Sequence, residues 1–326
     1  MGTLNGQVRW ALVGTGGYAR RDCAPAFAAV DRADLVAVVS SDADRAKAFA
    51  EGLDVAIATD DVSAAVEHDD IDAVWIASPS HMHAEHGRIA IEAGKHVLLE
   101  KPIALDAREA WELVALAEKA GTVLATGYQA RYVPAHLRMK ALIDEGVLGT
   151  LVMARSFYGM RRVGPPRTWR LHKETARWGT LADIGTHHLD LLRMLVGEVD
   201  GVSGFTAHRK GYETEDAATL ALHFAVGAVG TLTASSVVGR PAVVVEVLGT
   251  EGSLVATGTS PDGQGTATLH LADGEPEDIT GPTPLSFAAQ LDTVTRAMAG
   301  EDVAYATGVD GARNVEILEQ IEVAAL

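Results

Sequence analysis

The segment Val8-Arg-Trp-Ala-Leu-Val-Gly-Thr-Gly-Gly-Tyr-Ala19 places an apolar run directly before a glycine-rich turn. Within it, Gly14, Gly16 and Ala19 form the pattern G-x-G-x-x-A. The first glycine permits a tight turn, the second lets the backbone approach a pyrophosphate, and the small third residue lets a helix pack on the strand. The N-terminus of that helix would offer free N–H groups to phosphates. A plain strand-to-helix turn is the alternative interpretation.

Short apolar runs alternate with helical patterns from residue 8 to about residue 126. The helical segments begin at capping residues and stop at glycine, as 106–120 does before Gly121. Continuous apolar runs separated by helices indicate a parallel sheet covered on both faces. We therefore predict an α/β, doubly wound domain over 1–126, with strands at 8–13, 35–40, 55–58, 73–77, 96–100 and 123–126. In that setting the glycine pattern favours a dinucleotide site formed by Gly14, Thr15, Gly16, Gly17, Tyr18 and Ala19.

The pattern changes in the second half of the chain. Consecutive strands with hairpin turns are predicted from about 202 to 271, after a strand near 151–158. Runs of strands with few helices suggest an α+β domain on an antiparallel sheet. We therefore predict a second domain over 127–326, built on a large, open, mainly antiparallel sheet, with helices at 134–144, 180–196, 285–299 and 308–325.

Composition excludes several classes of protein. The 326 residues include 27 Lys and Arg against 44 Asp and Glu, and a net charge of −17 would repel a nucleic-acid backbone. The single cysteine, Cys23, cannot close an intramolecular disulfide and is expected to be buried. The N-terminus lacks a secretory pattern, so we expect a cytoplasmic protein. The uncharged stretch 217–239 alternates with period two around Gly227, which predicts a hairpin and not a membrane span.

The end of the second strand bears on the choice of dinucleotide. NAD sites usually carry an acidic residue there, and Ser40 stands in that place. We therefore favour NADP, with Ser40, Ser41 and Arg45 as contacts to its 2′-phosphate and Arg20 as a further cation. NAD is the alternative, because Asp42 could reach the ribose. In a purely structural interpretation, Ser41 or Asp42 caps the next helix and Arg45 is solvated.

A lysine follows the fifth strand, in Glu100-Lys101-Pro102. The carboxyl edge of an open parallel sheet is where such folds bind ligands. Partial desolvation lowers the pKa of a lysine towards the range useful for acid–base catalysis. The alternative is a lysine that only marks the strand exit and reaches solvent.

Asp183 and His187 lie four residues apart in a predicted helix and so share one face. The carboxylate could fix the tautomer of the imidazole and favour its protonated form. His188 belongs to the apolar stripe of that helix and is expected to pack in the core. Adjacent histidines point about 100° apart on a helix, so His187 and His188 cannot converge on one ion. No metal site is predicted.

Three motifs in this order resemble the Gfo/Idh/MocA family of nicotinamide-dependent oxidoreductases. They are the glycine loop, Ala93-Gly-Lys-His-Val-Leu-Leu-Glu-Lys-Pro102, and Asp183-x-Gly-x-His187-x-x-Asp190. The resemblance covers nearly the whole chain, because Ser78-Pro79-Ser80-x-x-His83 and Gly249-Thr-Glu-Gly-Ser253 also fit. It implies a Rossmann domain followed by an open-sheet domain that covers the nicotinamide and pairs subunits, so a homodimer or homotetramer is expected.

The resemblance further implies oxidation of a secondary alcohol of a sugar, cyclitol or polyol, or the reverse reduction of a ketone. Lys101 and His187 would handle the proton, with Asp183 steadying His187. Further cofactor contacts are implied at Ser78, Pro79, His83, Glu100, Lys101 and Gln129. Substrate contacts are expected at Lys101, Arg131, Trp169, Arg170, Asp183 and His187. Relatives that cleave glycosides with tightly held NAD, and non-catalytic dinucleotide sensors, give two alternatives; the sensors generally lack the lysine.

Two departures from the family pattern stand out. Gln129 replaces a typical asparagine, and Arg177-Trp178-Gly179 replaces a triple glycine, so Trp178 would narrow the sugar pocket. The segment 155–177 also carries seven Lys and Arg residues and one acid, Glu174. It could recognise a substrate carboxylate or phosphate. A solvated loop or a subunit contact would explain the same charges.

Overall fold

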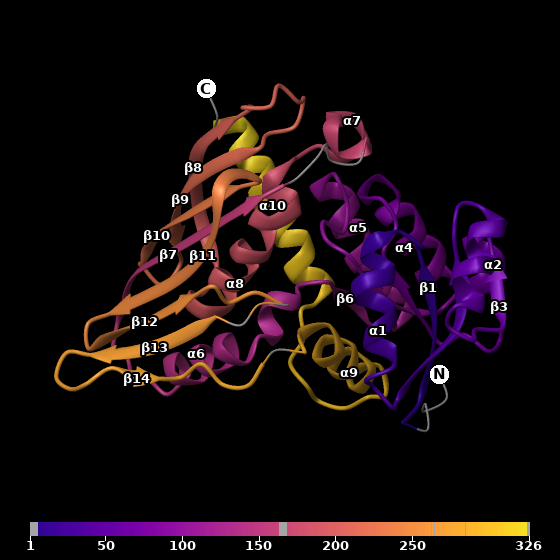
Figure 1. The fold of residues 1–326 in the computed structure, drawn as a ribbon, viewed down its shortest axis with the longest axis horizontal. Helices are drawn as coiled ribbons and strands as arrows, with labels where there is room; N and C mark the ends of the chain where they lie inside the picture. The colour runs from indigo at the N-terminus through magenta and orange to yellow at the C-terminus, as the bar shows by residue number, and fades with distance from the viewer. Residues whose placement is uncertain (1–5, 163–167, 262, 264, 284, 325–326) are drawn as a thin grey trace. The chain divides into compact units, whose positions relative to one another are not determined.

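The computed structural model describes residues 6–162, 168–261, 263, 265–283 and 285–324. The chain forms two compact units (Figure 1). Unit 1 consists of Met1–Gly127 and Phe287–Val315, and unit 2 consists of Tyr128–Ser286 and Glu316–Leu326. No helix in the described part of the chain is long and apolar enough to cross a membrane.

Unit 1 contains a parallel sheet of six strands in the order β3-β2-β1-β4-β5-β6. Its strands are β1 (Val8–Val13), β2 (Ala33–Val39), β3 (Ile57–Thr59), β4 (Ala73–Ile76), β5 (His96–Leu99) and β6 (Leu124–Thr126). Its helices are α1 (Ala24–Phe27), α2 (Ala43–Glu51), α3 (Val62–Val66), α4 (His83–Glu92), α5 (Ala107–Ala120) and α9 (Ser286–Met298). The strand order turns back between β1 and β4, which is the point where such folds bind ligands. The predicted doubly wound sheet is confirmed.

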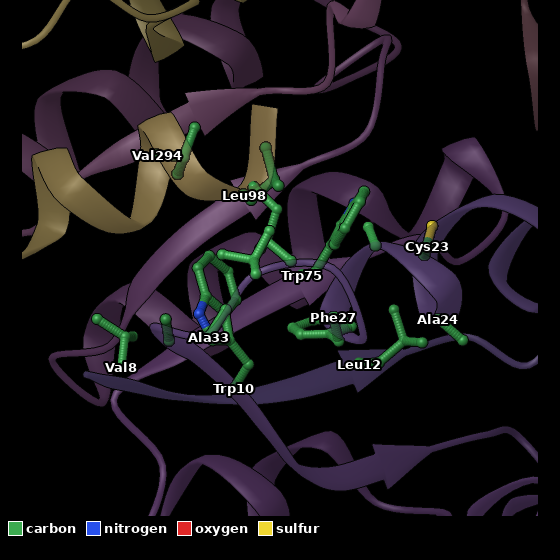
Figure 2. Close-up of a cluster of buried hydrophobic side chains, with 14 of the residues drawn as sticks. Val8, Trp10, Leu12, Cys23, Ala24, Phe27, Ala33, Trp75, Leu98 and Val294 are labelled. Atoms are coloured by element: carbon green, nitrogen blue, oxygen red, sulfur yellow. The ribbon is translucent and has the colours of Figure 1, made fainter. Parts of the chain in front are cut away.

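The core of unit 1 is centred on three aromatic rings. Figure 2 shows Trp10, Phe27 and Trp75 close together, with Phe27 at 6.1 Å from Trp10 and 5.8 Å from Trp75 between ring centroids. Helix α9 contributes Val294 to the same cluster, together with Leu291 and Met298. The sequence predicts all residues after 126 in the second domain, whereas this segment packs on the sheet of unit 1. Cys23 is fully buried here, as expected.

Unit 2 contains a sheet of eight strands in the order β14-β13-β12-β11-β7-β10-β9-β8. The β7–β10 pair is parallel and the other neighbours are antiparallel, which confirms a mainly antiparallel sheet. Its strands are β7 (Leu151–Arg161), β8 (Val199–Ala207), β9 (Ala217–Phe224), β10 (Val229–Ser235), β11 (Val237–Gly249), β12 (Gly252–Thr257), β13 (Thr266–Leu271) and β14 (Glu277–Asp278). Its helices include α6 (Pro134–Asp144), α7 (Lys173–Ala176) and α8 (Thr186–Val196), and α10 (Gly308–Ala324) spans both units.

The hairpin expected in the uncharged stretch is formed by β9 and β10. In β9, Ala218, Leu220, Leu222 and Phe224 are buried and the residues between them are not, so one face of the strand packs on the core. Gly227 makes the turn at a φ of +88°, a left-handed conformation that glycine adopts without steric cost. The sequence prediction of a hairpin in place of a membrane span is confirmed.

Three of the buried histidines in the described part of the chain have a strongly lowered pKa. His83 in unit 1 and His136 in unit 2 have a pKa of about 4, and His188 in unit 2 has a pKa of about 3. In each case burial disfavours the charged imidazolium and lowers the pKa from the ordinary 6.5. These side chains are therefore neutral in the folded protein at neutral pH.

Lowering the pH from about 7.5 to about 5 is expected to destabilise the protein. The unfolded chain takes up protons at these histidines below about pH 6.5, whereas the folded chain does not, so unfolding becomes more favourable as the pH falls. Each buried histidine then costs about 1.4 kcal/mol per pH unit, or roughly 2 kcal/mol at pH 5. Urea unfolding followed by circular dichroism measures the change, and equal midpoints at the two pH values would contradict it.

Candidate active site

The glycine loop lies at the carboxyl end of β1. Gly14 has a φ of +114°, and a Cβ built there would lie 2.6 Å from the carbonyl oxygen of Ala77. Only glycine fits this turn. Ala19 is fully buried against the sheet, and residues 19–23 form a π-helical turn before α1. Such turns are rare and occur often at functional sites.

The buried carboxylate of Glu100 is hydrogen-bonded to the glycine loop. The Tyr18 hydroxyl donates to Glu100 over 2.7 Å, and the Trp75 indole N–H donates to the same oxygen over 3.3 Å. Burial and the neighbouring Glu100 charge raise the pKa of Tyr18 well above its ordinary value. A Cβ at Gly127 would lie 2.6 Å from this carboxylate. Glu100 therefore ties the glycine loop to the ends of β4, β5 and β6.

His83 connects the turns that follow β4 and β5. Its Nδ1 lies 2.7 Å from the carbonyl oxygen of Pro102, and its Nε2 lies 2.9 Å from that of Ser78. Nδ1 of His86 lies 3.1 Å from the Ser78 hydroxyl. The bonds of His83 join the backbone of Pro102, directly after Lys101, to the turn after β4. Lys101 is half-buried at the carboxyl end of β5.

The predicted phosphate contacts come together at the end of β2. Arg45 donates to the hydroxyls of Ser40 and Ser41 over 2.9 and 2.8 Å, and the Ser40 hydroxyl is 2.8 Å from that of Thr15. Asp42 caps α2 by accepting from the Arg45 backbone N–H over 2.8 Å. Asp42 therefore caps the helix, and the Arg45 guanidinium also clusters with the hydroxyls of Ser40 and Ser41. The remaining predicted cation, the Arg20 guanidinium, lies over the ring of Phe49 at 4.7 Å.

In unit 2, the helix with Asp183 and His187 does not begin as the regular α-helix that the sequence predicts. Residues Leu181–Gly185 form a π-helical turn, and α8 continues from it. The buried Glu215 carboxylate accepts from the N–H groups of Gly179 and Leu181 over 2.8 and 2.9 Å. An anion at a helix N-terminus satisfies amides that lack a helical partner. Burial raises the pKa of Glu215.

Asp183 is held by two arginines. Arg162 donates to its Oδ2, and Nη2 of Arg170 lies 3.1 Å from its Oδ1. The Arg170 guanidinium also lies over the ring of Trp169 at 4.6 Å. The sequence predicts Asp183, Trp169 and Arg170 as site residues but does not single out Arg162. No local pattern shows this pairing, because β7 and the helix are separated in sequence.

His187 is placed by aromatic packing. The ring of Tyr128 meets it edge to face at 6.0 Å between centroids, and the Tyr128 hydroxyl is 3.1 Å from that of Thr186. Arg131 donates to both carboxylate oxygens of Asp190 over 2.6 Å each, and the Asp190 side chain is fully buried. Arg131, predicted as a substrate contact, is therefore bound to the same helix as His187.

Other predicted residues have mainly structural surroundings. His188 is buried and hydrogen-bonded to Ser156, as expected for a packed side chain. Gln129, which follows Tyr128 in the sequence, is buried. Trp178 is buried under the Arg177 guanidinium, at 4.6 Å, and lines a cavity of about 490 Å³ within unit 2.

The cationic segment 155–177 is largely paired with acids. Arg155 pairs with Glu246, Arg162 and Arg170 pair with Asp183, and Arg177 pairs with Glu319. Arg167 lies outside the described residues. Among the side chains that the structure describes, no group of three or more His, Cys, Asp or Glu could hold a metal ion.

The predicted site residues thus fall into two groups. The glycine loop, Ser40, Ser41, Arg45 and the β4–β5 turns with Lys101 lie together in unit 1, at the carboxyl ends of its strands. Unit 2 carries Gln129, Arg131, Trp169, Arg170, Asp183 and His187. The first group can bind a dinucleotide. The second presents the His187 imidazole on α8 and, in the π-helical turn before it, the Asp183 carboxylate held by two arginines.

Comparisons with known proteins cover both halves of the chain. Residues 8–128 match a family described as an oxidoreductase family with an NAD-binding Rossmann fold, and residues 136–255 match the GFO/IDH/MocA C-terminal domain. A 1,5-anhydro-D-fructose reductase of Ensifer adhaerens is 31% identical over 307 residues, covering 93% of this chain and 92% of the relative.

Solved structures share the whole fold. An aldose-aldose oxidoreductase from Caulobacter crescentus, complexed with glycerol, has a TM-score of 0.89 at 27% identity, covering 98% of this chain and 97% of that one. Levoglucosan dehydrogenase in complex with NADH and levoglucosan has a TM-score of 0.89 at 24% identity and covers the same shares.

Proposed function

This chain belongs to the Gfo/Idh/MocA family of oxidoreductases, and we propose that it transfers a hydride between NADP and a secondary alcohol or ketone of a sugar, cyclitol or related polyol. The relatives are named as reductases and dehydrogenases of sugars, which supports this activity over glycoside hydrolysis or a sensor role. A small-molecule substrate and no nucleic-acid partner are in keeping with the acidic composition. A cytoplasmic location stays a prediction from the sequence.

The residues at the end of β2 fit an NADP 2′-phosphate. Arg45 supplies a guanidinium, and Ser40 and Ser41 supply hydroxyls that this guanidinium already orders. Charge-assisted bonds from such groups to phosphate oxygens are strong. The Asp42 carboxylate caps α2 by accepting from the backbone N–H of Arg45. This cluster is the observation that carries the proposal of NADP over NAD.

We expect Arg45→Ala to lower kcat/KM for NADPH by about 10- to 100-fold, because one bond to a charged group contributes about 1.5–3 kcal/mol. The value for NADH should change less than about threefold, since NADH has no 2′-phosphate. Steady-state rates followed at the nicotinamide absorbance give both constants. Lys47→Ala, an exposed cation on the same helix, is the matched control. A wild-type enzyme that responds to NADH alone would overturn the choice of cofactor.

A bound nicotinamide would supply or accept the hydride, and residues of this chain would handle the proton. In the oxidative direction, the imidazole of His187 takes the proton of the substrate hydroxyl. The Lys101 ammonium donates to the same oxygen and stabilises the charge that develops on it. Asp183 holds the imidazole in one orientation. The substrate loses one hydride and one proton, and a carbonyl group is formed.

We assign further substrate contacts to Trp169 and Arg170. The indole is an apolar surface suited to a sugar ring, and the guanidinium stacked on it is a hydrogen-bond donor group of the kind that binds hydroxyls. Arg131, which is bound to Asp190 on the helix of His187, is a further proposed substrate contact. Trp178 stands where the family pattern has a glycine, and its role in narrowing the sugar pocket stays a prediction from the sequence.

The outer face of the unit 2 sheet is the proposed contact between subunits. Phe205, Met153 and Val229 point outward from β8, β7 and β10, and they are 78%, 50% and 47% exposed. Exposed apolar side chains on one face of a sheet mark a surface for association. A second copy of the same face would cover them, which gives a homodimer or, by further pairing, a homotetramer.

A further inference from the structure

Both carboxylate oxygens of Asp183 are engaged by arginines that come from different segments of unit 2. Arg162 binds Oδ2, and Arg170 lies 3.1 Å from Oδ1. The side chains of Asp183 and Arg162 are only 18% and 24% exposed, so this contact is largely shielded from solvent. A shielded pair of this kind fixes geometry more firmly than an ion pair on the surface.

Each arginine is anchored independently of the helix that carries Asp183. The backbone N–H of Arg162 donates to the carbonyl of Ser236 over 3.0 Å, directly after β7. The carbonyl of Arg170 accepts from the Thr214 hydroxyl over 2.8 Å. The two guanidiniums therefore come from fixed backbone, and Asp183 is clamped between them.

Asp183 itself lies in the π-helical turn, where the backbone is wider than in an α-helix. Residues four and five apart share a face in such a turn, so Asp183 and His187 remain on one side of the helix. A carboxylate that orients an imidazole must stay within a few tenths of an ångström of its working position. The arginines supply that restraint from outside the helix.

We propose that Arg162 is a positioning residue of the reaction, which acts through Asp183 on His187 and does not touch the substrate. This inference rests on the proposed function. Arg170 shares the clamp, but it also stacks on Trp169, and we assign both residues to substrate binding. The two arginines should therefore behave differently when Asp183 is neutralised.

A double-mutant cycle tests the proposal. Arg162→Gln should lower kcat by about tenfold or more and change KM less than about threefold, because it disturbs orientation and not substrate binding. In an Asp183→Asn background, Arg162→Gln should change kcat less than about twofold, because Arg162 acts only through the Asp183 carboxylate, which is then absent. Arg162→Lys should restore part of kcat, as it keeps the charge but not the planar fork.

Arg170→Gln should keep an effect on KM in the Asp183→Asn background. Arg138→Gln breaks an exposed ion pair with Glu145 in the same unit and serves as the control for losing an arginine. Additive losses from Arg162→Gln and Asp183→Asn would overturn the proposal. Absence of turnover in the wild type with every sugar and both dinucleotides would instead refute the proposed function.

A measurement that needs no turnover distinguishes failure of the positioning role from failure of the proposed function. Nitrogen-15 NMR of histidine-labelled protein reports the tautomer of His187, whose signals are identified by their loss in His187→Asn. The wild type should show one tautomer, and Arg162→Gln and Asp183→Asn should both shift it towards the same mixture. An unchanged tautomer in Arg162→Gln would contradict the positioning role, whatever the enzyme's activity.

Discussion

Replacing Lys101 with methionine is expected to lower kcat/KM by about 10³-fold. The substituted side chain keeps the length and the apolar stem of lysine but cannot donate to the substrate oxygen. A positioned donor to a developing negative charge typically contributes a factor of 10² to 10³, and a lost proton donor adds to that. Rates with NADPH and a panel of keto-sugars, followed at the nicotinamide absorbance, measure the loss.

The control for Lys101→Met is Lys119→Met, which removes an exposed lysine at the end of α5 in the same unit. Its rate should match the wild type. Binding of NADPH to Lys101→Met, measured by the fluorescence of the reduced nicotinamide, should change less than about threefold because the phosphate contacts lie elsewhere. Undiminished turnover in Lys101→Met would remove the lysine from the mechanism.

Replacing His187 with asparagine is expected to lower kcat by about 10²- to 10³-fold, because asparagine cannot take up the proton that leaves the substrate hydroxyl. The loss should appear in kcat more than in KM, since the proton moves only during the reaction. Initial rates in the oxidative direction with a saturating sugar alcohol measure it.

His270→Asn, an exposed histidine on β13, is the matched control for His187→Asn. The double variant of Lys101 and His187 should lose less than the product of the two single losses, because both groups serve one oxygen. A full product of losses would mean that the two residues act on separate steps.

Strands β1, β4, β5 and β6 of unit 1 could be predicted because they are buried on both faces. Continuous apolar runs such as those of β1 and β5 leave no other interpretation when glycine and capping residues separate them. The turn at Gly14 could also be predicted, since its left-handed backbone needs glycine and the sequence provides it in the right place.

The place of α9 could not be predicted from its sequence. An amphipathic helix shows which of its faces is buried but not which surface covers that face. The residues 285–299 therefore predict a helix, while the packing of Val294 and Leu291 on the sheet of unit 1 is known only from the structure. The chain therefore cannot be divided into two domains at a single position, because Phe287–Val315 belongs to unit 1.

In the candidate site, the residue types were predictable and many of their partners were not. Ser40 and Ser41 directly follow β2, and Arg45 lies in the first turn of α2, so their meeting follows from local geometry. The clamp of Arg162 on Asp183 joins residues 21 apart across two elements, and no spacing rule connects them. Long-range pairs of charges are set by the fold as a whole.

The most direct measurement is a crystal structure of the protein with NADP and a bound sugar substrate. Nζ of Lys101 and Nε2 of His187 should both lie about 3 Å from one substrate oxygen, at the carbon that faces the nicotinamide. Nitrogens that approach different oxygens, or lie beyond hydrogen-bonding reach of the sugar, would contradict the shared role of Lys101 and His187.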